Sequence, residues 1–283
     1  MAQGNDSPPR IDSHQHFWRY SVEEYGWIDD SMARLRRDFL PADLRGELDA
    51  VGLDGCIAVQ ARQTNEETDF LLELAEQNDW VRAVIGWVDL RSEDVADELA
   101  RIADHPKLAG VRHIVQAEPD DEFVLREDFQ RGIRAMQEHD LVYEVLVFPN
   151  QLPASIELCR RFPEQTFVLD HLAKPYAKRG EVESWASHIR DMAALPNVSC
   201  KLSGLCTEAD WSKWTVESLT PYVDVVFDAF GSDRILYGSD WPVCLVASAY
   251  QRWFEAVGHW LAPLAKAQRD AVLGGNAARI YGL

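Results

Sequence analysis

Short runs of β-branched, aromatic and aliphatic residues recur along the chain, and segments with helical spacing of apolar positions separate them. Several runs, such as residues 56–59 and 167–169, are nearly continuous hydrophobic stretches, which is typical of strands covered on both faces of a parallel sheet. The pattern predicts eight strands, at residues 10–14, 55–60, 83–90, 108–114, 142–147, 166–171, 198–203 and 234–240.

Helices are expected between these strands. Phe70, Leu71 and Leu74, for example, recur at helical spacing with acidic residues opposite them. Because strands and helices alternate without a Gly/Ser/Pro-rich linker, we expect an α/β fold, with a single TIM-type (β/α)8 barrel as one domain over residues 1–283. A doubly wound open sheet is the alternative, which the absence of a Gly-rich phosphate loop after any strand disfavours. The predicted helices are residues 65–78, 92–104, 126–140, 151–162, 181–195, 218–230 and 250–261.

Two connections, residues 17–40 and 206–221, are longer than the rest. Both follow predicted strands and so lie on the side where barrels place their active sites. Long loops in a compact barrel usually have a functional role, so we expect both to cover the site. Both are rich in aromatic residues, namely Trp18, Tyr20, Tyr25, Trp27, Trp211 and Trp214.

The charge balance narrows the range of partners. With 28 Lys plus Arg against 47 Asp plus Glu, the formal charge is −19, which disfavours nucleic acid. No apolar run approaches the roughly 20 residues of a membrane helix, so no membrane association is expected. The five cysteines lack regular spacing, and the N-terminus does not resemble a secretory signal, so we expect a cytoplasmic protein, either a monomer or a homo-oligomer.

Polar side chains gather at the predicted strand ends. His14 and His16 close the first strand, and in an extended chain residues i and i+2 point to the same face. His171 ends the sixth strand and Asp240 the eighth. One carboxylate with three imidazoles is the composition of a mononuclear metal site, or of a metal-free site in which a general base has hydrogen-bond donors beside it.

Six segments, taken as an ordered set, carry a resemblance to a known family. They resemble the amidohydrolase superfamily, and within it the amidohydrolase-2 branch that includes sugar-acid and pyrone-dicarboxylate lactonases. The resemblance runs from the first strand to the end of the chain. The segments are IDSHQHFW at 11–18, GVRH at 110–113, LDHLAKP at 169–175, KLSGL at 201–205, YGSDWP at 237–242 and GNAARIYG at 275–282.

The resemblance implies a distorted barrel that hydrolyses a cyclic carboxylic ester. Asp240 matches the aspartate that activates water, and His14, His16 and His171 match the histidines that polarise the carbonyl. The same four residues would hold a single zinc ion, which some lactonases of this branch do not require. No bridging lysine ends the fourth or fifth strand, and Glu144 is the only acidic candidate there, which disfavours a two-metal centre. No organic cofactor is expected.

Other residues near the strand ends are candidates for binding the substrate. A dicarboxylate would need several converging arginines, whereas only Arg112, with Lys174 and Lys201, is found around the expected site. This favours a neutral aldonolactone, and the resemblance favours an L-fucono- or L-rhamnono-lactone, with a role in L-fucose degradation. The substrate-binding candidates are Arg112, His113, Glu144, Lys174, Trp241 and Trp27; each also has a structural interpretation as an ion pair, a solvated loop residue or ordinary packing.

Three alternatives to sugar-lactone hydrolysis stay open at this point. A dicarboxylate lactone of the pyrone-dicarboxylate or muconolactone type would be hydrolysed by the same chemistry. A metal-dependent decarboxylase of the same branch would need a tightly held metal ion. An inactive barrel that serves as a binding protein is disfavoured, because the strand-end histidines and Asp240 are all present.

Overall fold

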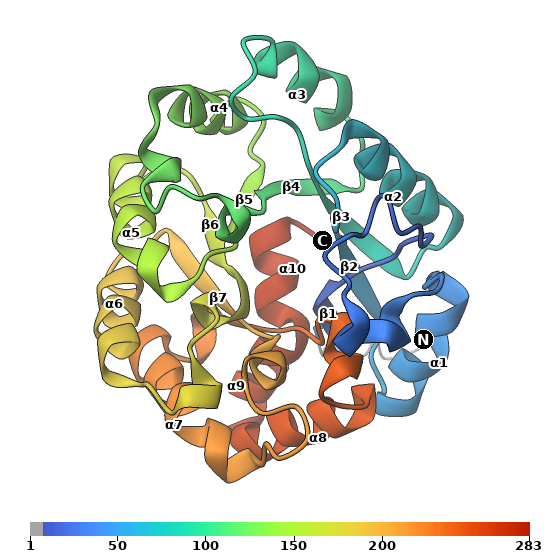
Figure 1. Ribbon diagram of the computed structural model, residues 1–283, viewed down its shortest axis with the longest axis vertical. Coiled ribbons are helices and arrows are strands. Elements are labelled where there is room, and N and C mark those ends of the chain that lie inside the picture. The colour runs from blue at the N-terminus through green and yellow to red at the C-terminus, as the bar shows by residue number, and fades with distance from the viewer. Residues whose placement is uncertain (1–7) are drawn as a thin grey trace, which may run out of the picture.

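The computed structural model describes residues 8–283, and its eight strands form one parallel sheet in the order β1 to β8 (Figure 1). The sheet curls into a barrel, because Gln15 at the end of β1 forms a parallel bridge with Trp241, just beyond β8. The predicted (β/α)8 barrel is therefore confirmed over a doubly wound sheet. The strands are β1 (Ile11–Gln15), β2 (Gly55–Val59), β3 (Val81–Gly86), β4 (Leu108–His113), β5 (Val142–Val145), β6 (Phe167–Leu169), β7 (Val198–Leu202) and β8 (Ile235–Tyr237).

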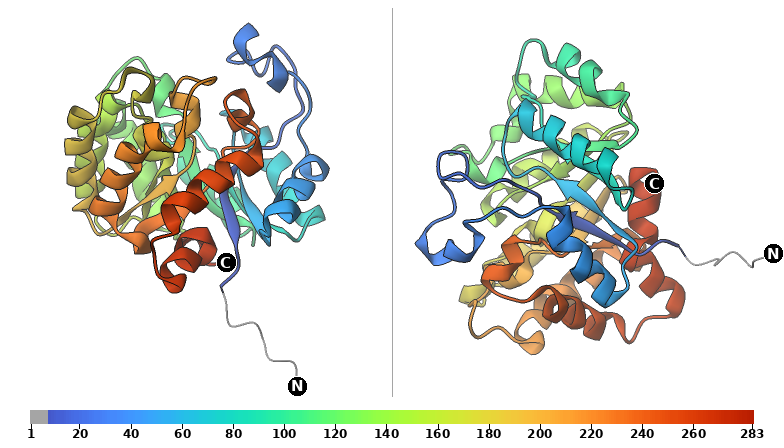
Figure 2. Two further views of the ribbon diagram at one scale, coloured as in Figure 1. Left: turned by 90° about the horizontal axis from the view of Figure 1, so that it is seen from below. Right: turned by 90° about the vertical axis from the view of Figure 1, so that its right-hand side faces the viewer.

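Helices lie around the outside of the strands, as Figures 1 and 2 show. Each of the seven predicted helices overlaps an observed one, and α1, α9 and α10 were not predicted. The α-helices are α1 (Pro41–Val51), α2 (Asn65–Gln77), α3 (Val95–Ala103), α4 (Glu127–Gln137), α5 (Leu152–Arg161), α6 (Glu183–Ala193), α7 (Val216–Phe230), α8 (Tyr250–Leu261), α9 (Lys266–Asp270) and α10 (Asn276–Tyr281).

Two predicted boundaries differ from the structure for local reasons. Helix α3 begins at Val95 rather than at residue 92, because the segment before it forms a turn in which the amide of Asp94 donates to the Ser92 hydroxyl. Helix α7 begins at Val216, where the Thr215 side chain accepts from a backbone amide of the first turn. Pro221 therefore lies inside α7 and does not mark the end of the second long connection.

Strands β3, β6 and β8 are shorter than the apolar runs that predicted them. The chain leaves β6 at Leu169 and β8 at Tyr237, so His171 and Asp240 lie in turns just beyond the strands. Both residues have positive φ, 52° for His171 and 59° for Asp240. The predicted placement of these two residues on strands is therefore wrong, although both remain at the carboxyl-terminal end of the barrel.

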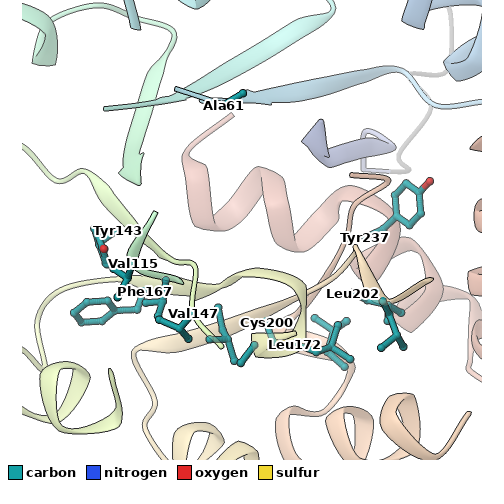
Figure 3. Close-up of a cluster of buried hydrophobic side chains, with 14 of the residues drawn as sticks. Ala61, Val115, Tyr143, Val147, Phe167, Leu172, Cys200, Leu202 and Tyr237 are labelled. Atoms are coloured by element: carbon teal, nitrogen blue, oxygen red, sulfur yellow. The ribbon is translucent and has the colours of Figure 1, made fainter. Parts of the chain in front are cut away.

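Strand residues alternate between two buried clusters. The outward-facing ones pack against the surrounding helices; Figure 3 shows part of this cluster, with Tyr143, Phe167, Cys200, Leu202 and Tyr237 from four successive strands. The five cysteines are all buried and free. This cluster fixes the strands to the helices and leaves the inward-facing positions for other tasks.

A second, apolar cluster combines strand residues with residues of the C-terminal helix. Helix α10 contributes Ala277 and Tyr281 to it, and Figure 1 shows α10 in the middle of the ring of strands. The C-terminal helix thus closes the lower end of the barrel. We call this cluster the lower layer; its buried members are Ile11, Ile57, Val59, Ala83, Ile85, Val142, Val168, Leu236, Ala277 and Tyr281.

The connection between β1 and α1 includes the first predicted long loop, and it projects from one end of the barrel (Figure 2). Trp18, Tyr25 and Phe39 hold its base in the core through edge and tilted ring contacts. Its tip reaches the segment after β8, where Arg34 donates to the carbonyl of Leu245. In the part of the chain that the structure describes, no helix is long and apolar enough to cross a membrane.

Candidate active site

Asp240 lies among three imidazoles at the carboxyl-terminal end of the barrel. Its Oδ1 atom is 3.4 Å from Nε2 of His16, 3.9 Å from Nε2 of His171 and 4.0 Å from Nε2 of His14. The carboxylate is 4% exposed. The structure thus brings together the four residues that the sequence singled out, which lie at or just beyond the ends of β1, β6 and β8, far apart along the chain.

A buried aspartate, Asp12, joins β1 to the segment after β8, beneath this group. One oxygen of Asp12 accepts from the backbone amides of His14 and Ser239, and the other accepts from the hydroxyl of Tyr250 on α8. Burial raises the pKa of Asp12 to about 6, against the lowering effect of these hydrogen bonds. Strand β1 carries one extra residue between Asp12 and Gln15 relative to β2, which sets the direction of His14 and His16.

A left-handed turn presents His171 and Lys174 to the same side. All four residues from His171 to Lys174 have φ between 47° and 56°, a conformation that costs about 1–2 kcal/mol for each residue with a side chain. Gly204 makes room for the turn, because a Cβ atom there would lie 2.5 Å from Nδ1 of His171. A strained, buried turn of this kind is typical of a functional site.

The Nδ1 atom of each imidazole is occupied by a neighbour. His16 Nδ1 donates to the carbonyl of Val59 at 2.8 Å, and His171 Nδ1 lies 2.8 Å from the hydroxyl of Ser203. His14 Nδ1 lies 3.3 Å from Oδ1 of Asp170 and 3.2 Å from Nζ of Lys201. These contacts leave the Nε2 atoms turned toward Asp240. Neighbours that fix a histidine in this way determine which ring nitrogen carries the lone pair.

The protonation states follow from burial and from the neighbouring charges. Burial lowers the pKa of His14 well below its ordinary value, and the charges of Lys201 and Arg112 lower it further. Burial likewise lowers the pKa of His171. Burial alone would raise the pKa of Asp240, but His171 and His16 outweigh it and lower that pKa. At neutral pH the site therefore holds an ionised carboxylate beside neutral His14 and His171.

Four buried charged residues lie at inward-facing positions beside this group, and we call them the charged layer: Arg112, Glu144, Asp170 and Lys201. Arg112 Nη1 is 2.9 Å from Asp170 Oδ2 and 3.1 Å from His14 Nε2. Lys201 Nζ is 2.5 Å from Glu144 Oε1 and 3.3 Å from Asp170 Oδ1. Lys201 and Arg112 hold the pKa of Asp170 well below its usual range despite burial, whereas burial and Asp170 raise the pKa of Glu144 to about 7.

A cavity of about 270 Å³ opens above Asp240. Six of the candidate residues line it, and the rest of its wall is mainly aliphatic. The lining residues are His16, Trp27, Ala61, Arg112, Ile114, Gln116, Ala117, Leu146, His171, Lys174, Asp240 and Val243.

His113, Glu144 and Trp241 were candidates for substrate binding, but they do not line this cavity. His113 contacts Glu118 at 2.7 Å and stacks on Phe123, on the outer side of β4. The other two also have neighbours that account for them. Glu144 is engaged by Lys201 and Tyr281 inside the barrel, and Trp241 packs edge-on against Phe17 and Phe39.

The sequence did not single out three polar residues that the structure adds. Gln116 lines the cavity, and its Oε1 atom is buried without a hydrogen-bond partner among residues 8–283. Glu208 lies 3.4 Å from Lys174 Nζ, and burial raises its pKa. Asp170 was noted only as the residue before His171. Its position two residues after the inward-facing Val168 is the signal that would have placed it inside the barrel.

The donor atoms of the site suit a zinc ion. Among residues 8–283, two groups of three residues each bring their ligand atoms within 4.8 Å of one another. One group is His14, His16 and Asp240, and the other is His14, Asp170 and His171. Ligands of a tetrahedral zinc ion lie about 3.3 Å apart, and the 3.4 Å between His16 and Asp240 matches that spacing. Arg112 already donates to Nε2 of His14, so a cation there would compete with the guanidinium.

Comparisons with known proteins find matches that span nearly the whole chain. The profile of the amidohydrolase family matches residues 11–283. The chain is 45% identical to an L-fucono-1,5-lactonase of Burkholderia multivorans, over 97% of this chain and 96% of that protein. It is 39% identical to an L-fucono-1,5-lactonase of Burkholderia ambifaria, over 96% and 95%. A crystal structure of a B. multivorans amidohydrolase with bound zinc superposes with a TM-score of 0.94 at 44% identity, covering 97% of this chain and 99% of that one.

Proposed function

The chain belongs to the amidohydrolase family, and we propose that it hydrolyses L-fucono-1,5-lactone or a closely related aldonolactone to the aldonic acid. The observation that carries the proposal is the ionised Asp240 at the base of a cavity, with three imidazoles around its Oδ1 atom. The names of the two relatives supply the substrate, and the geometry supplies a means of activating water. The enzyme is then a hydrolase that acts on a carboxylic ester bond.

Asp240 acts as the general base in this proposal. It takes a proton from water as the water oxygen bonds to the lactone carbonyl carbon, and a positioned base of this kind contributes about 10²–10⁴ in rate. The bond between that carbon and the ring oxygen then breaks, and the proton returns from Asp240 to the ring oxygen. The lowered pKa of Asp240 makes it a weak base, which suits an ester with a far better leaving group than an amide.

Negative charge on the carbonyl oxygen needs donors in the cavity. Arg112 and Lys174 are its two cationic lining residues, and each donor aimed at an oxyanion typically contributes about 10²–10³ in rate. His16 donates its Nδ1 proton to Val59, so in its neutral form Nε2 carries a lone pair. His16 therefore polarises a carbonyl as a donor only when protonated, and in its neutral form it serves as a metal ligand instead.

The cavity wall fits a small hydroxylated ring. Trp27 lies on the projecting loop, is 44% exposed and forms one flat side of the cavity. Gln116 offers an unpartnered amide oxygen that can accept from a sugar hydroxyl. Ile114 and Leu146 supply apolar surface on which the carbon side of a ring can rest.

A single zinc ion would be held by His14, His16, His171 and Asp240. When bound, it would polarise the lactone carbonyl or lower the pKa of the attacking water. Asp170 would then orient His14 from behind, in the manner of a carboxylate that fixes a metal-binding histidine. The protein's own donors, Arg112 and Lys174, support the oxyanion with or without the ion, so we propose that zinc is not essential.

We also propose that the enzyme is cytoplasmic and that it acts on a small molecule and not on nucleic acid. The net charge of −19 disfavours nucleic acid, and the five free, buried cysteines fit a reducing compartment. A dicarboxylate lactone is a poorer fit, because Arg112 and Lys174 are the only cationic side chains that line the cavity among residues 8–283.

A pH-indicator assay tests the proposal, because each lactone that is hydrolysed releases a proton at neutral pH. Purified protein is offered L-fucono-1,5-lactone, other aldonolactones and a pyrone-dicarboxylate lactone, each with a protein-free blank, before and after removal of metal by a chelator. We expect turnover of the L-fucono-lactone that survives chelation. Turnover of the dicarboxylate alone, or of no lactone, would overturn the substrate proposal; loss of activity that zinc restores would overturn only its metal-independent part.

A further inference from the structure

The C-terminal segment resembles the tail of the family, yet nothing in the proposed reaction uses it. Its helix α10 lies in the middle of the ring of strands (Figure 1) and packs against the lower layer. We propose that Tyr281, on this helix, is a positioning residue for lactone hydrolysis and acts on His14 through Glu144 and Lys201. The inference rests on the proposed function, but it adds a residue that lies outside the cavity.

A continuous chain of short contacts joins Tyr281 to the site. The Tyr281 hydroxyl donates to Glu144 Oε1 at 2.6 Å, and the same oxygen is 2.5 Å from Lys201 Nζ. Lys201 Nζ is in turn 3.2 Å from His14 Nδ1 and 3.3 Å from Asp170 Oδ1. Each member from Glu144 onward is completely buried, and Tyr281 is 7% exposed, so water does not screen these contacts.

The hydroxyl of Tyr281 fixes how Glu144 holds Lys201. Both donors meet at Oε1 of Glu144, while Oε2 has no hydrogen-bond partner among residues 8–283. Without the hydroxyl, Lys201 would be the single hydrogen-bond donor left to this buried carboxylate. An under-satisfied buried carboxylate is costly, so Glu144 would draw its remaining donor, Lys201, closer. Lys201 would then shift away from the position between His14 and Asp170.

That position matters because it sets the tautomer of His14. Arg112 and Lys201 can only donate, and they lie 3.1 Å from Nε2 and 3.2 Å from Nδ1 of His14, so the neutral ring accepts from one of them and carries its proton on the other nitrogen. While Glu144 holds Lys201, we infer that Nε2 accepts from Arg112 and that Nδ1 carries the proton. Nδ1 then lies 3.3 Å from Oδ1 of Asp170, while Lys201 donates to Glu144 and lies 3.3 Å from the same Asp170 oxygen. A displaced Lys201 would leave Asp170 free to turn and His14 free to rotate or change tautomer. His14 Nε2 lies 4.0 Å from Oδ1 of Asp240, the proposed general base, so a change in His14 reaches the reacting site.

Tyr281 also belongs to the lower layer, so a purely structural role must be separated from positioning. The variant Tyr281→Phe removes the hydroxyl and keeps the ring. Its matched control is Tyr222→Phe on α7, a buried tyrosine whose hydroxyl has no partner among residues 8–283. A structural role would lower the thermal unfolding temperature and leave kcat of the folded enzyme unchanged.

We expect Tyr281→Phe to lower kcat on L-fucono-1,5-lactone about tenfold, which corresponds to about 1.4 kcal/mol in the barrier, through the altered position of His14. KM should stay within twofold, because the hydroxyl lies outside the cavity. Tyr222→Phe should keep both constants. In a Glu144→Gln background, the same Tyr281→Phe change should alter kcat less than twofold, because the route through the carboxylate is already broken. An unchanged kcat in Tyr281→Phe, or fully additive losses, would overturn the proposal.

A readout without substrate separates this inference from the proposed function. The ¹⁵N shifts of the His14 ring, assigned with a His14→Gln variant, report its tautomer. We expect Tyr281→Phe to change them and Tyr222→Phe to leave them as in the wild type. If the wild-type protein hydrolyses no lactone, the function fails and these shifts still decide the positioning role; unchanged shifts in Tyr281→Phe would end it.

Discussion

The interior of the barrel has two layers of opposite character, which meet along β5 and β6. On β5 and β6, the lower layer contains Val142 and Val168, and two residues further on the charged layer contains Glu144 and Asp170. Two residues along a strand correspond to about 6.6 Å. A single step of the inward-facing alternation therefore separates an apolar plug from a network of buried charges.

The difference between the layers indicates what each contributes. Burying apolar side chains in the lower layer stabilises the fold. Buried charges are a poor source of stability, since well-packed apolar residues in their place are often as stable or more so. The charged layer, in which Arg112, Lys201 and Asp170 contact His14, is better explained by the chemistry above it.

Asp240→Asn should produce the largest effect, and it tests whether the site above the charged layer serves catalysis and not stability. Asparagine keeps the shape of the side chain but cannot take a proton from water, so we expect kcat to fall by about 10²–10⁴ with an unchanged unfolding temperature. The exposed Asp224→Asn on α7 is the matched control. Steady-state kinetics and thermal unfolding measure both variants, and near-wild-type turnover in Asp240→Asn would refute its role as the base.

Leu236→Ala tests whether the lower layer serves stability and not catalysis. This fully buried leucine on β8 belongs to the lower layer, and its truncation should lower the free energy of unfolding by about 2–5 kcal/mol. We expect kcat of the folded enzyme to stay within twofold. Urea unfolding gives the stability, with the exposed Val22→Ala as a control that should cost under about 0.5 kcal/mol. A tenfold loss of kcat without a loss of stability would show that the layers are not separate.

The sequence predicted the barrel because its signals are local and repeated. Continuous apolar runs and helical periodicity need no knowledge of distant contacts, and all eight strands were found. The strand ends were harder to predict. Leu172 and Ala173 are as apolar and buried as a strand, yet they form a left-handed turn. Hydrophobicity reports burial and cannot distinguish these two backbone conformations.

The candidate site was predictable only in part, for the same reason. His14, His16, His171 and Asp240 stand out as polar residues at the ends of apolar runs, and the structure brings them together. Whether a polar residue near a strand end faces inward depends on register. His113 directly follows the inward-facing Arg112 on β4 and so points outward, and Trp241 lies in the turn after β8, which is why neither lines the cavity.

Gln116→Leu sharpens the view of the upper side. If its unpartnered amide accepts from a sugar hydroxyl, kcat/KM on L-fucono-1,5-lactone should fall about 10–100-fold, because the hydroxyl then loses its partner. Unsubstituted δ-valerolactone has no such hydroxyl, so its kcat/KM should change less than threefold. The exposed Gln77→Leu serves as the control. Equal losses on both lactones would show that Gln116 does not read a hydroxyl.

His113→Gln should produce the smallest effect. His113 directly follows Arg112 on β4 but points outward, so the variant tests whether a neighbour of the charged layer affects stability alone. Burial lowers the pKa of His113 below its ordinary value of 6.5, with Arg91 adding to the shift while Glu118 and Asp89 oppose it. The unfolded chain then binds more protons than the folded one near pH 6, so this residue should reduce stability as the pH falls below 6.5. Urea unfolding of wild type and His113→Gln between pH 5.5 and about 8 measures the difference, in which contributions from the other histidines cancel. We expect the wild type to lose more stability than the variant toward low pH, by at most about 1.4 kcal/mol for each unit of separation between the two pKa values. Parallel curves would show that burial does not displace this titration, and a loss of kcat in His113→Gln would place the residue in the reaction after all.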